Sequence, residues 1–301
     1  MDWFIIGLAS AMLFGGVMVV DKRMLDRHFP SVSSFIFVAG VVQIVIGLVA
    51  LAVAVPLLGL ADVDGLVIGF WSGVVWALGL TFFFYGLRLE EVSRATPIYG
   101  TNPLFASLLA VVFLGERLSG LQVGAVAAIV IGAGLASYRP TPGRRGFISP
   151  RALAILLVGS ALTGIAFVVN KEATTLSSFW LVFGGRSLGL GVGMAAFAYR
   201  RSLFANVAAA LSNPTARRLY FGGEIVMASA AVTLLQLAIT LGPISLVSAL
   251  NSTRSLFVLA ITLGLSTRFW NVLDEPMDRN TVTLKLASTA LIVAGVIGLV
   301  L

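Results

Sequence analysis

Met-Val-Val-Asp-Lys at Met18–Lys22 returns as Phe-Val-Val-Asn-Lys at Phe167–Lys171, in each case at the end of a long apolar stretch. Ser-Ser-Phe follows each copy, at Ser33–Phe35 and at Ser177–Phe179. The second half of the chain therefore repeats the first. If each repeat crosses a membrane an odd number of times, the second copy must run upside down relative to the first. Inverted repeats are typical of secondary transporters, whose substrate site lies where the halves meet.

The composition is that of a membrane protein. Hydrophobic residues make up 58% of the 301 residues, charged residues 11%, and the mean hydropathy is +1.02. A soluble domain carries about 25% charged residues, so the composition predicts an all-α polytopic membrane protein. The chain has no Cys and one His, His28, which argues against disulfides and metal centres. We expect no cofactor and no catalytic residues.

The chain contains ten apolar segments of about the 20 residues that a membrane-spanning helix needs. The first five predict one five-helix repeat over residues 1–137, and the last five predict a second over residues 152–301. Between them, the Pro- and Arg-rich segment 138–151 is the predicted linker. The ten predicted spans are 3–20, 33–55, 66–87, 95–113, 119–137, 152–169, 178–199, 219–240, 244–265 and 284–301.

The basic residues predict how the chain is oriented. Most of the 20 Lys and Arg residues fall in the loops that follow the first, third, fifth, seventh and ninth spans. Cytoplasmic loops carry the excess of Lys and Arg, so both termini are predicted to lie outside the cytoplasm, at the inner or plasma membrane of a prokaryotic cell. The net charge of +7 is explained by these loops, and we expect no nucleic-acid partner.

The fourth and ninth spans are unusually polar at their centres. The fourth holds two prolines and a glycine around Tyr99 and Asn102, and the ninth holds Asn251 and Arg254 at the corresponding place. Proline removes a backbone hydrogen bond and weakens a helix. Polar, broken segments at matching places in two repeats indicate a transporter site, so we expect these four residues to line a central cavity.

Two more ionisable residues fall inside predicted spans, Arg186 in the seventh and Glu224 in the eighth. Such residues are costly in a bilayer and are functional candidates. Arg186 is a candidate substrate ligand and Glu224 a candidate proton carrier. A structural alternative is that Arg186 pairs with Glu224 or reaches a helix end. The Gly-xxx-Gly spacing of Gly185, Gly189 and Gly193 predicts close helix packing.

The segment Asn102–Ser119, which includes Leu-Gly-Glu-Arg, resembles the EamA-type repeat of the drug/metabolite transporter superfamily. Ile131–Gly134, Leu13–Gly16 and Lys22 resemble the same repeat. In the second half, Ser-Thr-Arg at Ser266–Arg268 stands where Gly-Glu-Arg is usual. The resemblance implies transport of small metabolites, amino acids, nucleotide-sugars or drugs.

These observations favour a secondary transporter that exports a small anionic or zwitterionic metabolite, such as an amino acid or organic acid. Arg254 and Arg186 would bind its carboxylate or phosphate. Export of lipophilic cations is an alternative that a carboxylate inside the first span would favour, but Asp21 is predicted to lie at the end of that span. A lipid-headgroup flippase or a non-transporting scaffold are further alternatives, and an enzyme is the least favoured. Because both halves are fused, we expect a monomer in the lipid bilayer.

Overall fold

The computed structural model describes residues 2–58, 63–113, 117–136, 138, 149–199, 203–265 and separate residues between 283 and 298. All regular structure in these ranges is helical, and eight helical segments are long and apolar enough to cross a membrane. The helices are α1 (Asp2–Arg27), α2 (Val32–Leu58), α3 (Val63–Leu89), α4 (Val92–Tyr99), α5 (Asn102–Phe113), α6 (Gly120–Ala136), α7 (Pro150–Leu176), α8 (Phe179–Ala198), α9 (Leu203–Ser212), α10 (Pro214–Tyr220), η1 (Phe221–Ala228), α11 (Ser229–Leu241), α12 (Ile244–Ser252) and α13 (Arg254–Leu265).

The predicted spans correspond to these helices in order, with differences at three places. The fifth predicted span is the shorter apolar helix α6, and most of the tenth lies outside the described residues, as does most of the linker 138–151. The loop after the seventh span contains a short helix, α9, that the periodicity did not predict. A count of ten spans therefore remains a prediction.

The fourth and ninth predicted spans are each broken in the middle. Helix α4 ends at Tyr99 and α5 begins at Asn102, whereas α12 ends at Ser252 and α13 begins at Arg254. Proline 103 cannot donate to the carbonyl of Tyr99, and the side chain of Asn102 replaces that donor, with Nδ2 3.1 Å from the Tyr99 oxygen. The predicted weakness of the fourth span is confirmed, and the ninth span, which was predicted only to be polar at its centre, is broken as well.

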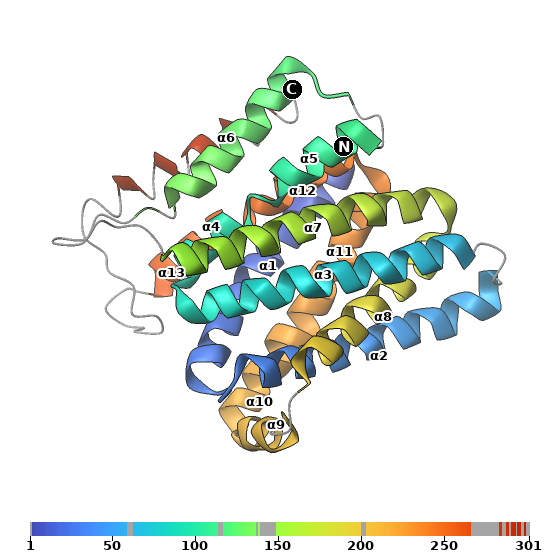
Figure 1. The fold of residues 1–301 in the computed structure, drawn as a ribbon, viewed down its shortest axis with the longest axis vertical. Coiled ribbons are helices and arrows are strands. Elements are labelled where there is room, and N and C mark those ends of the chain that lie inside the picture. Colours follow the sequence, from blue (N-terminus) through green and yellow to red (C-terminus); the bar gives the residue numbers. More distant parts are fainter. Residues whose placement is uncertain are drawn as a thin grey trace.

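One group of helices packs side by side in the order α2, α8, α3 and α7 (Figure 1). Glycines allow this close approach. A methyl group on Gly40 of α2 would come within 2.9 Å of the Gly191 carbonyl oxygen of α8. On the other side of α8, methyl groups on Gly185, Gly189 and Gly193 would collide with α3. The close packing predicted from the glycine spacing is therefore confirmed.

The second group of contacts forms around α1, which packs against η1, α11, α12 and α13. Helix α5 joins the two groups because it contacts both α7 and α12. Contacts between the halves have counterparts. The contact of α1 with α11 corresponds to that of α7 with α3. The contact of α13 with α1 corresponds to that of α5 with α7.

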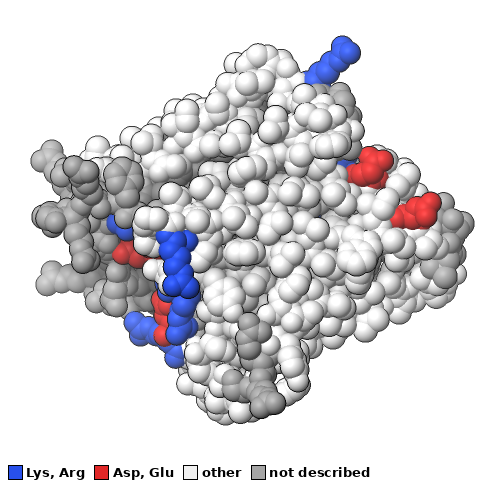
Figure 2. All heavy atoms as spheres, in the orientation of Figure 1, with Lys and Arg blue, Asp and Glu red and all other residues white. Residues whose placement is uncertain are grey.

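The surface carries a broad uncharged band. On the face shown in Figure 2, charged side chains lie toward the two ends of the molecule and the area between them holds none. Large apolar side chains point outward there and elsewhere, among them Leu57, Phe113 and Phe204, which are 77%, 72% and 67% exposed. Apolar surface on this scale is stable in lipid. With the eight long apolar helices, it identifies an integral membrane protein.

Candidate functional site

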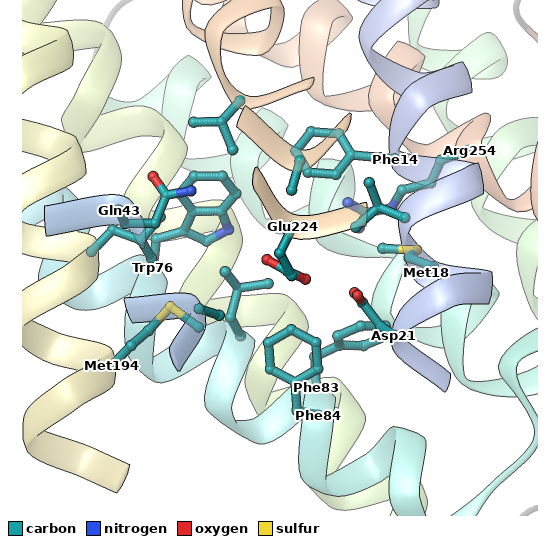
Figure 3. A pocket seen from close by; sticks show the side chains of 16 residues that line it. Phe14, Met18, Asp21, Gln43, Trp76, Phe83, Phe84, Met194, Glu224 and Arg254 are labelled. Atoms are coloured by element: carbon teal, nitrogen blue, oxygen red, sulfur yellow. The ribbon is translucent and has the colours of Figure 1, made fainter. Parts of the chain in front are cut away.

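A cavity of about 50 Å³ lies at the centre of the molecule, where helices of both halves converge (Figure 3). That volume holds only a few water molecules. Aromatic and apolar side chains form most of its wall, and Asp21, Gln43, Glu224 and Arg254 are its polar members. The lining residues are Phe14, Val17, Met18, Asp21, Ala39, Gln43, Trp76, Leu80, Phe83, Phe84, Leu190, Met194, Glu224, Ala228, Val232 and Arg254.

The carboxyl groups of Asp21 and Glu224 point toward one another in this cavity (Figure 3), and both residues line it. Asp21 belongs to α1 and Glu224 to η1, and the two side chains are 3% and 6% exposed. Asp21 Oδ1 has no hydrogen-bond partner among the described residues. The site therefore contains a pair of buried carboxyl groups, one from each half of the chain.

The prediction that Asp21 lies at the end of the first span is wrong. Helix α1 continues to Arg27, beyond the last apolar residue of the predicted span, and buries Asp21. The helix can continue because Lys22 lies against the end of α3, where Nζ donates to the carbonyl oxygens of Leu87 and Glu90 at 2.9 and 3.0 Å. Asn170, the repeat partner of Asp21, lies inside α7 in the same way.

Glu224 lies on η1, a π-helical segment in an otherwise α-helical span. Two glycines, Gly222 and Gly223, precede it, and glycine is a poor α-helix former. A methyl group on Gly223 would come within 2.7 Å of the Val20 side chain. This close approach of η1 to α1 brings Glu224 next to Asp21. Single π-helical turns often occur at functional sites.

Arg254, at the start of α13, is the basic member of the cavity. Its guanidinium carbon lies 4.9 Å from the ring centre of Tyr99, which stacks on Phe83 with 4.5 Å between ring centres. Within the described part of the chain, Arg254 Nε and Nη2 have no hydrogen-bond partner although the residue is 2% exposed. Two donors of a buried cation are thus available to a ligand.

The other three residues of the predicted polar centres are buried but do not line the cavity. The Tyr99 hydroxyl lies 2.6 Å from the hydroxyl of Thr163. The Asn102 side chain donates to the Tyr99 carbonyl oxygen at the break between α4 and α5. Both polar side-chain atoms of Asn251 lack hydrogen-bond partners among the described residues. Of the four residues, Arg254 reaches the cavity and Tyr99 supports it from behind.

Arg186 lies in a separate cluster and does not pair with Glu224. Its guanidinium carbon is 4.2 Å from the ring centre of Trp76 and 5.7 Å from that of Phe167, and Nη1 donates to Gln236 Oε1 at 2.7 Å. A desolvated cation–π contact is worth about 2 kcal/mol, whereas burying an unpaired ion costs several kcal/mol. These contacts compensate only part of the cost of burying Arg186.

The sequence analysis missed several cavity residues, namely Asp21, Gln43 and the aromatic wall. Aromatic residues are common in apolar helices, so nothing in the sequence marks Trp76 or Phe83 as special. No group of acidic, Cys or His residues suited to a metal ion occurs among the described residues. Buried polar groups in the middle of apolar helices, contributed by both halves, define a polytopic membrane protein with a central polar site.

Comparison with known proteins finds a family match in the first half of the chain. Residues 1–138 match the model of the EamA-like transporter family. That part, slightly less than half of the chain, is similar to an EamA domain. The resemblance predicted from the sequence is confirmed for the first half.

Two individual proteins are similar over longer stretches. The glucose uptake protein GlcU of Staphylococcus xylosus is 28% identical over 201 residues, which cover 63% of this chain and 65% of that protein. A protein of known crystal structure is 16% identical and superposes with a TM-score of 0.64, covering 99% of this chain and 96% of its own. The latter similarity shows that the two chains share a fold.

Proposed function

We propose that this protein is a proton-coupled secondary transporter that moves a small polar solute by alternating access at the central cavity. The observation that carries the proposal is the Asp21–Glu224 pair, in which each half of the chain contributes one buried carboxyl group to the same cavity. Relative movement of the halves would separate or join the pair. Such movement would change the exposure of the cavity and the proton affinity of the pair together.

The pair suits proton coupling because two adjacent carboxylates in an apolar site repel one another. Carboxyl groups placed in this way share a proton. The pair would hold a proton while its two groups are together. It would release the proton when the groups are hydrated or when they bind solute, and this release would couple proton flow to transport. Glu224, the predicted proton carrier, would act with Asp21 rather than alone.

The charges of the cavity support a solute with no net charge. A carboxyl pair that shares one proton has one negative charge, which balances the positive charge of Arg254. A zwitterionic metabolite such as an amino acid fits this arrangement, because Arg254 can bind its carboxylate and the pair can bind its ammonium group. A lipophilic cation would be opposed by Arg254, and a simple anion by the carboxyl pair. The proposed direction is export.

Sugar uptake is the second candidate. Asp21, Glu224 and Gln43 offer hydrogen-bond acceptors for hydroxyl groups, and Gln43 Oε1 has no partner within the described ranges. The flat ring of Trp76 lies in the same wall and suits the apolar face of a sugar. The relative named as a glucose uptake protein favours the same class of neutral solute.

The proposal includes ten spans arranged as two inverted five-helix repeats in a cell membrane. The paired contacts between the halves support the repeat, as do Lys22 and Lys171, which occupy equivalent positions. Lys171 Nζ donates to the carbonyl oxygens of Ile239 and Gly242, each at 2.9 Å, at the end of α11, as Lys22 does at the end of α3. The excess of basic residues in one set of loops supports extracytoplasmic termini. A single chain supplies both halves of the cavity, which supports a monomer.

The test is transport by the purified protein in liposomes that contain a pH-sensitive dye. Amino acids, glucose and a quaternary ammonium compound are added in turn, with transport measured in both directions. We expect a solute-dependent pH change with amino acids, or with glucose for the second candidate. A response to the quaternary ammonium compound alone, or solute movement without proton movement, would contradict the proposal.

A further inference from the structure

Arg186 lies behind the wall of the central cavity. The Trp76 ring lines the cavity, and the Arg186 guanidinium stacks on that ring without itself lining the cavity. Its other neighbours are Phe167, Gln236 and, through Gln236, Asn170. Helices of both halves therefore meet at this cluster, which the carboxyl pair and Arg254 do not use.

The cluster has more free donors than free acceptors. Gln236 Oε1 accepts from Arg186 Nη1 at 2.7 Å and from Asn170 Nδ2 at 2.9 Å, which fixes the orientation of the amide. Three donors of the cluster then have no partner among the described residues, namely Arg186 Nε, Arg186 Nη2 and Gln236 Nε2. The one acceptor without a donor is Asn170 Oδ1.

The cluster also lacks a counterion within the described part of the chain. Neither ion pair found there includes Arg186, which is 1% exposed. Asn170 is the repeat partner of Asp21, so the position that carries a carboxylate in the first half carries a neutral amide here. A buried cation without a counterion is unstable in an apolar protein interior, and an external anion would supply the missing charge.

We propose that Arg186 and Gln236 bind one small anion, either an inorganic ion such as chloride or a carboxylate, at a site that Trp76 separates from the central cavity. The anion accepts hydrogen bonds from the free guanidinium and amide donors and compensates the charge of Arg186. If the bound anion is the carboxylate of the transported solute, the inference rests on the proposed function. If the bound anion is an inorganic ion, the inference is independent of the proposed function.

The experiment measures the thermal stability of the purified protein in detergent. Sodium chloride or sodium acetate is titrated at constant ionic strength, which is maintained with sodium isethionate. We expect the melting temperature of the wild type to rise by several degrees with one or both anions. A response to chloride alone identifies an inorganic ion, and a response to acetate alone identifies a carboxylate.

Five variants locate the response. Arg186→Gln removes the cation and Asn170→Asp supplies an internal carboxylate, so both should lose the anion response. Arg217→Gln and Glu172→Gln, which change exposed charged residues outside both sites, should retain it. Trp76→Phe should retain the thermal response but lose any anion-dependent change in tryptophan fluorescence.

The proposal is overturned if neither anion stabilises the wild type, or if Arg186→Gln responds as the wild type does. If Arg186→Gln cannot be purified, Asn170→Asp decides, because an undiminished response in that variant also overturns the proposal. Failure of proton coupling in liposomes would leave an anion response at Arg186 intact, so the two proposals fail separately.

Discussion

Asp21 and Glu224 come from different halves of the chain, yet their carboxyl groups face one another in the central cavity (Figure 3). The EamA domain that the chain matches ends at residue 138, so only Asp21 belongs to the matched part. The pair exists because η1 approaches α1 closely at Gly223. A change in the contact between the halves would therefore act directly on the carboxyl pair.

The first prediction concerns proton coupling. Asp21→Asn and Glu224→Gln each remove one carboxylate, so the pair can no longer take up and release a proton in the same way. We expect the solute-dependent pH change in liposomes to fall to the level of protein-free vesicles. The control is Glu172→Gln, which changes an exposed carboxylate outside the cavity. Unchanged proton movement in Glu224→Gln would exclude the pair from coupling.

The second prediction concerns substrate affinity. Arg254 offers two free donors to the cavity, and hydrogen bonds to charged groups are worth about 1.5–3 kcal/mol. Arg254→Gln should therefore weaken binding of a zwitterionic solute by about 10-fold to 100-fold, as measured by equilibrium binding to purified protein. Arg217→Gln, at an exposed position on α10, is the control. If the two variants bind equally well, Arg254 does not hold the solute.

The third prediction concerns packing between α3 and α8. A methyl group at Gly189 would overlap the carbonyl oxygen of Phe70, whereas one at Gly124 on α6 has no atom within 4 Å. Overpacking of this kind costs about 1–3 kcal/mol. Gly189→Ala should lower the melting temperature in detergent, and Gly124→Ala should not. Equal stability of the two variants would mean that the helices are farther apart than described.

The fourth prediction uses the two equivalent lysines. Lys22→Met removes the donor at the end of α3, and Lys171→Met removes the donor at the end of α11. Each change should speed amide hydrogen exchange in the segment that follows its own helix, near Glu91 or near Gly242, and leave the other segment unchanged. Mass spectrometry of peptic fragments measures both segments in one experiment. If the wild type and both variants exchange at the same rate in both segments, the lysines do not stabilise the ends of α3 and α11.

The fifth prediction concerns orientation, and the absence of Cys from the chain makes it simple to test. A single Cys at Ser119 should react with a membrane-impermeant maleimide only from outside the cell. A single Cys at Ser202, which lies outside the described residues, should react only from the cytoplasm. Labelling of both positions from the same side would contradict the inverted repeat.

Much of the fold could be predicted from the sequence because hydrophobic length and charge act locally. The breaks at Gly100 and Thr253 follow from proline and polar residues in the fourth and ninth spans. Arg186, Glu224 and Arg254 were conspicuous as charged residues in apolar segments. The burial of Asp21 was missed because the length of α1 depends on the contact of Lys22 with the end of α3, which no local pattern encodes.

The sequence by itself determined an all-helical membrane protein with a duplicated motif, and it identified the charged residues that cannot be explained as lipid-facing. Its apolar segments are long enough to span a bilayer whatever their neighbours are. Only the tertiary structure decided which of these charges meet. It joined Glu224 to Asp21 and Arg186 to Gln236, because partners from distant segments are selected by helix packing at glycine contacts, and that packing is a property of the whole fold.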